Sequence, residues 1–158
     1  METLLDRWLA SALECYSEET VRFLGAEKDS FRNPVGHTLR QNLAVLLEQV
    51  LGGLEADAAK ASLANILHVR AVQELTPAQA VAFVFQLRPL LCEPSPQAGS
   101  EELDARIDQL ALWAFEEYTR CRERIAGLRI SESRRSMAFA ARCATGRHES
   151  GDKAGSQT

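Results

Sequence analysis

Apolar residues recur every three or four positions along most of this chain, which is the spacing of one face of an α-helix. Runs of β-branched residues bounded by turn signals are absent, so no strand is predicted. The pattern predicts about six helices, over residues 2–15, 17–25, 33–52, 57–74, 77–88 and 101–130. The fold class is therefore predicted to be all-α.

The helix over residues 77–88 is the most apolar of the six. Its segment from Ala80 to Phe85 is apolar on every side, which is typical of a helix surrounded by others. We expect Val81, Val84 and Phe85 to be nearly inaccessible, together with at least part of Phe83. The architecture predicted is a single-domain globin-like or irregular bundle around helix 77–88.

Two corners of the chain carry clear helix start signals. Thr76 can cap helix 77–88, with Pro77 at its first position and Gln79 completing a capping box. Asn33 can cap the predicted helix 33–52, with Pro34 at its first position. Helix 77–88 is expected to end before Pro89, because the residue preceding a proline avoids the helical region.

Charge is distributed unevenly along the chain. Residues 1–119 hold nine Lys or Arg against eighteen Asp or Glu, whereas residues 120–158 hold nine against four. An acidic domain repels a phosphate backbone, so nucleic acid is excluded as a partner of that part. We expect a helical domain over residues 1–130 and a basic, partly disordered C-terminal tail over residues 131–158.

The cellular setting follows from the cysteines and from hydropathy. The four cysteines are irregularly spaced without a C-x-x-C pair, so free thiols are expected and a zinc site is not. The N-terminus lacks the pattern of a signal peptide. No apolar run approaches the roughly 20 residues that span a bilayer. The sequence predicts a cytoplasmic protein without a membrane span.

Candidate chemistry is sparse. Phosphate-binding loops, nucleophile elbows and metal-binding helix motifs are missing, so neither an enzyme nor a metal site is predicted. His37 or His68 could ligate haem in a globin-like bundle, since imidazole is the usual proximal ligand. A structural histidine is the favoured interpretation. We expect a colourless protein without a cofactor.

Polar side chains gather at the two corners, next to very apolar sequence. They allow two interpretations: hydrogen bonds that tie the corners together, or a small ligand pocket lined by aromatic and polar groups. The ligand-binding candidates under the second interpretation are Phe31, Asn33, His37, Arg70, Gln73, Gln79 and Phe83.

The same two corners carry a family resemblance. The segments FRNPVGHT, residues 31–38, and VRAVQELTPAQAVAFV, residues 69–84, resemble the RsbRD N-terminal domain family, and the likeness extends over about residues 5–130. The family is named after an RsbT co-antagonist of the bacterial general-stress pathway. The resemblance implies an all-helical sensory or regulatory domain without catalytic residues. Members of the stress pathway also carry a C-terminal STAS domain, for which residues 131–158 are too few.

Two functions are therefore expected from the sequence. The first is a stand-alone sensory or regulatory domain of bacterial signalling, acting by protein–protein interaction as a homodimer or with another signalling protein. The second is a protein that binds a small molecule or tetrapyrrole beside helix 77–88. The partner-interface candidates are Leu110, Trp113 and Tyr118.

Helix 101–130 cannot turn all of its aromatic residues inward. Trp113 and Phe115 cannot both face the interior together with Leu110, so one of the two is left near the surface. Packing of Trp113 against Trp8 within the chain is the alternative to a partner contact.

Overall fold

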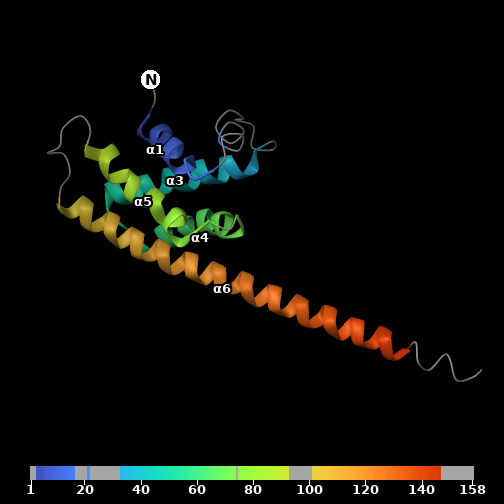
Figure 1. The fold of residues 1–158 in the computed structure, drawn as a ribbon. Helices are drawn as coiled ribbons and strands as arrows, with labels where there is room; N and C mark the ends of the chain where they lie inside the picture. Colours follow the sequence, from blue (N-terminus) through green and yellow to red (C-terminus); the bar gives the residue numbers. More distant parts are fainter. Residues whose placement is uncertain (1–2, 17–20, 22–32, 74, 93–100, 147–158) are drawn as a thin grey trace, which may run out of the picture. The chain divides into compact units, whose positions relative to one another are not determined.

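The computed structural model describes residues 3–16, 21, 33–73, 75–92 and 101–146. These residues form helices and no strands, which confirms the all-α class (Figure 1). The helices are α1 (Leu4–Leu13), α3 (Pro34–Gly52), α4 (Ala56–Val72), α5 (Pro77–Cys92) and α6 (Glu101–Gly146). Apart from Val21, the predicted helix 17–25 lies outside the described residues, so the count of six helices and the globin-like arrangement stay predictions.

The chain divides into two compact units, Met1–Arg122 and Glu123–Thr158. The first unit contains α1, α3, α4, α5 and residues 101–122 of α6. The second contains residues 123–146 of the same helix. We expected this last helix to end near residue 130, and that expectation was wrong, because α6 continues to Gly146. The described helices include none that is both long and apolar enough to cross a membrane.

The core of the first unit is built by contacts among its helices. α1 packs against α3 and α5, and α4 packs against α3 and α5. Each helix turns its stripe of aliphatic and aromatic side chains inward, as the spacing predicted. Fully buried members of this core include Trp8, Leu39, Leu46, Ile66, Phe83 and Leu110.

Helix α5 differs from its prediction in two respects. Val81, Phe83 and Val84 are buried as expected, but Phe85 is 48% exposed. An apolar helix needs neighbours on every side to be wholly buried, and the outer face of α5 is left open in this unit. The helix also continues through Pro89 to Cys92. The preference of the residue before a proline for extended backbone is a local bias that tertiary packing can override.

Both predicted caps are present. The backbone N–H of Gln79 donates to Thr76 Oγ1 at 3.3 Å, and the backbone N–H of Thr76 donates to Gln79 Oε1 at 3.0 Å. The backbone N–H of Gly36 donates to Asn33 Oδ1 at 2.8 Å. A Cβ atom at position 36 would lie 2.3 Å from Asn33 Nδ2, so the cap requires glycine there.

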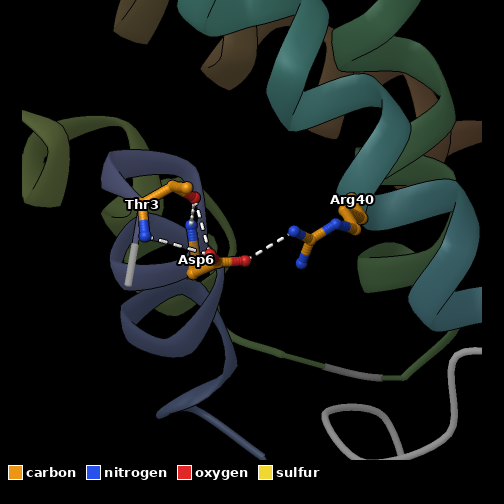
Figure 2. Close-up of polar contacts among 3 residues, drawn as sticks. All are labelled: Thr3, Asp6 and Arg40. Carbon is orange, nitrogen blue, oxygen red and sulfur yellow. Dashed lines mark hydrogen bonds and ion pairs between the residues drawn. The ribbon is translucent and has the colours of Figure 1, made fainter. Parts of the chain in front are cut away.

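Helix α1 begins with a second capping box (Figure 2). The backbone N–H of Asp6 donates to Thr3 Oγ1 at 3.1 Å, and the backbone N–H of Thr3 donates to Asp6 Oδ2 at 3.0 Å. The other carboxylate oxygen accepts from Arg40 of α3 at 2.5 Å. These donors, first the side chain and backbone of Thr3 and then Arg40, hold the pKa of Asp6 well below its ordinary value.

Candidate functional site

Arg70 lies at the junction of three helices. It comes from the last turn of α4 and is 1% exposed. Its Nη2 donates to the carbonyl oxygen of Ala12, at the end of α1, at 2.6 Å. Its Nη1 donates to the carbonyl oxygens of Gln79 and Ala80, in the first turn of α5, at 3.2 and 3.3 Å. One guanidinium therefore joins α1, α4 and α5.

The positive charge of Arg70 is compensated by dipoles and by an aromatic face. Among the residues that the structure describes, no carboxylate pairs with it. The Ala12 carbonyl belongs to the negative end of the α1 helix dipole, which favours a cation. The guanidinium carbon also lies 4.7 Å from the ring centroid of Phe83, where cation–π attraction contributes.

Phe83 extends this junction into the core. Its ring stacks on Trp8, with centroids 6.2 Å apart and an interplanar angle of 27°. The indole Nε1 of Trp8 donates to the carbonyl oxygen of Phe83 at 2.7 Å. A buried indole N–H needs such an acceptor, so the pair fixes the position of α1 on α5.

A small pocket of about 200 Å³ lies beside the junction. It is lined by Ser11, Ala12, Glu14, Cys15, Arg70, Gln79, Ala82, Phe83 and Gln86. Two of the lining residues carry a buried polar atom without a hydrogen-bond partner among the described residues, Arg70 Nε and Gln86 Oε1. The hydroxyl of Tyr16, next to Cys15 in the sequence, is another such atom. Burial raises the pKa of Tyr16, and the charge of Arg70 opposes that rise. Water or a small ligand could satisfy such groups.

The structure brings together only part of the predicted ligand set. Arg70, Gln79 and Phe83 share the small pocket. Asn33 is absent from the pocket lining, and its side chain caps α3.

The remaining candidates lie elsewhere. His37, His68 and Gln73 are exposed, and none of them lines the small pocket. Phe31 lies outside the described residues. The hydrogen bonds described for this set stay within each corner, from Gly36 to Asn33 and from Arg70 to Gln79, so both interpretations of the polar residues stay predictions.

A second, larger feature is an apolar groove between α5 and α6, with a volume of about 1000 Å³. Its walls are formed by Pro77, Ala78, Val81, Ala82, Phe85, Gln86, Pro89, Asp108, Ala111, Leu112 and Phe115. Leu112 is 66% exposed and Phe115 is 56% exposed. Sequence reasoning missed this groove. The sequence feature that could have indicated the groove is the segment 80–85, which has more apolar residues than one buried stripe of a helix requires.

The predicted interface residues occupy different environments. Leu110 and Tyr118 are 0% and 2% exposed, and the Tyr118 hydroxyl donates to the carbonyl oxygen of Leu75. Neither side chain offers surface to a partner in this structure. Trp113 is half-buried, with the Lys60 ammonium 5.1 Å from its ring centroid. Phe115 is the exposed aromatic.

Two arginines of α6 hold the groove's second wall in place. Arg106 Nη1 donates to the carbonyl oxygens of Val50 and Leu51, at the end of α3, at 2.9 and 3.3 Å. Arg122 Nη1 donates to the carbonyl oxygen of Ala71, in the last turn of α4, at 3.1 Å. The last carbonyls of a helix lack partners within the helix, so cationic donors there stabilise both helices.

Metal-ligating side chains are spread apart within the described residues. Histidine, cysteine and carboxylate side chains do not gather there in groups of three or more that could hold a metal ion. Cys15 and Cys92 are free thiols, and Cys121 is buried with its Sγ 3.8 Å from Glu117 Oε1.

Fold and site define an all-helical domain with an open apolar groove. The family model described as the RsbT co-antagonist protein rsbRD N-terminal domain matches residues 2–133. The chain belongs to this family, which confirms the resemblance seen at the two corners. No curated protein and no solved structure matches the chain. Membership implies a sensor domain of stress-response signalling.

Proposed function

We propose that this chain is a non-catalytic regulatory domain of a cytoplasmic stress-response system and acts through contact with another protein. The observation that carries the proposal is the groove between α5 and α6, where Phe85, Leu112 and Phe115 are all about half exposed or more. Contiguous exposed apolar surface of this kind is typical of interaction sites. The partner is another signalling protein or a second copy of the chain.

Genetic complementation tests this proposal. Deletion of the gene should change the induction of stress-response genes, and the wild-type chain should restore it. A Leu112→Glu variant that accumulates to the wild-type level should fail to restore it, because a charge in the groove opposes apolar contact. Leu51→Glu is the matched control, since Leu51 of α3 is 51% exposed and does not line the groove. Unchanged gene induction after deletion would refute the regulatory role.

A second candidate function is small-molecule binding at the pocket beside Arg70. Its support is two buried polar atoms without partners among the described residues, Arg70 Nε and Gln86 Oε1, whose residues line a volume of about 200 Å³. That volume resembles engineered cavities that bind single-ring molecules, which enclose about 150 Å³. Neither His37 nor His68 lines this pocket, so a haem iron would find no histidine ligand in it.

Thermal-shift screening with small carboxylates and amides tests the second candidate. A true ligand should raise the melting temperature of the wild type and leave that of Gln86→Leu unchanged. Equal shifts in both proteins would place binding elsewhere.

A further inference from the structure

We infer that the groove between α5 and α6 accepts an amphipathic helix of a partner protein, one whose polar flanks are basic. This inference rests on the proposed function and names the chemistry of the partner. Helix-in-groove binding needs an apolar channel with the length and width of a short helix, and side-chain positions that repeat with the helical period.

The walls of the groove meet those conditions. On α5, Ala78, Val81, Phe85 and Pro89 follow each other at three- and four-residue steps. The eleven helical steps from Ala78 to Pro89 span about 16 Å, which is three turns. Asp108, Leu112 and Phe115 repeat in the same way along α6. The volume of about 1000 Å³ is comparable to three turns of a helix about 10 Å wide.

The negative charge of the unit that contains the groove favours a basic partner helix. The unit that contains the groove, residues 1–122, has eleven Lys or Arg against eighteen Asp or Glu, a net charge of −7. Arg88, beside the groove, faces two carboxylates, Asp104 and Asp108, each at 2.7 Å. Arg88 cancels only one of these two negative charges, so a net negative charge remains at this end of the groove.

The opposite end of the groove repeats this arrangement. Beyond Phe115 on α6, Arg120 faces Glu116 and Glu117. Arg122, two residues further on, adds a second positive charge at this end. A helix with basic residues flanking its apolar stripe would therefore meet uncompensated negative charge at the end of the groove near Asp104 and Asp108.

A second copy of the chain fits the groove less well. Two grooves facing each other would bring together surfaces of the same negative sign, which costs free energy. The basic segment 123–146 offers another occupant, with five Arg against two Glu. Its exposed apolar residues fall on two sides of the helix, Leu128 with Phe139 and Ile130 with Met137, so neither side presents a three-turn stripe.

Three synthetic peptides of about fourteen residues probe the inference. The first has leucines in one helical stripe and lysines elsewhere. The second has the same composition with the leucines scrambled around the helix, and the third has glutamates in place of lysines. Fluorescence anisotropy with the full chain should give micromolar binding for the striped lysine peptide. Each of the other two should bind at least about tenfold more weakly.

Substitutions then locate the binding surface. Leu112→Ser should weaken binding of the striped lysine peptide at least about fivefold, because it removes an exposed apolar contact. Leu51→Ser, on α3, should leave binding unchanged. Circular dichroism should show the same helix content in both variants and the wild type.

Several results would overturn the inference. Equal binding of the striped and scrambled lysine peptides would indicate unspecific charge attraction. An unchanged affinity in Leu112→Ser would place the peptide elsewhere. Sedimentation that shows a dimer of the full chain, dissociated by Leu112→Ser, would assign the groove to a second copy. A failed peptide experiment alongside a clear deletion phenotype would refute this inference and leave the regulatory role standing.

Discussion

Arg70 Nη2 lies 2.6 Å from the carbonyl oxygen of Ala12, which is 58 residues away in sequence. A buried cation therefore binds a carbonyl at the C-terminal end of α1. The same guanidinium bonds the first turn of α5. The polar residues at this corner therefore have a structural role.

Replacement of Arg70 should destabilise the domain strongly. Arg70→Met would remove the guanidinium hydrogen bonds to Ala12, Gln79 and Ala80 and leave the carbonyl at the end of α1 without this donor, at a cost of about 2–3 kcal/mol in the free energy of unfolding. Urea denaturation measures that cost. Arg40→Met removes an arginine whose side chain is 49% exposed, and should cost no more than about 1 kcal/mol. Similar losses for the two variants would contradict the role assigned to Arg70.

Two phenylalanines of α5 should respond in opposite ways to truncation. Phe83 is 0% exposed and stacks on Trp8, so Phe83→Ala should cost about 3–5 kcal/mol. Phe85 is 48% exposed, and Phe85→Ala should cost less than about 1 kcal/mol. The comparison uses urea denaturation of monomeric protein. A large loss from Phe85→Ala would mean that the outer face of α5 is covered in solution.

The Thr76 cap of α5 should contribute measurably to the stability of the folded domain. Thr76→Ala removes the oxygen that accepts from the Gln79 backbone N–H and should cost about 1 kcal/mol. Thr76→Ser keeps that oxygen and should retain most of the stability. Thermal unfolding of the three proteins separates these outcomes, and an equal loss in both variants would argue against a capping role.

The stability contribution of Asp6 should disappear in acid. Its pKa is lowered in the folded state, so the contribution is complete above its unfolded value of 3.8 and is lost as pH falls below that value. The difference in stability between the wild type and Asp6→Asn should therefore shrink from about pH 5 to about pH 2. Asp57→Asn, an exposed carboxylate of α4, is the control. A constant difference over that range would show that the pKa shift is absent.

Local sequence signals determined the starts of α3 and α5. Asn33 and Thr76 cap α3 and α5 as predicted, because a cap depends only on residues within one turn of it. The helical period also identified the buried positions Leu39, Leu46 and Phe83, since one stripe of each helix has to face the core. The two segments that resemble the family, residues 31–38 and 69–84, contain these caps.

Only the tertiary structure decided which apolar face remains open. Phe85 and Phe83 are chemically identical and two residues apart, yet one is half exposed and the other buried. The difference depends on where α1 and α6 lie around α5, and a periodic pattern does not contain that information. The acceptors of Arg70 were likewise invisible in the sequence, because Ala12 is 58 residues from it and contributes a backbone oxygen that any residue would supply.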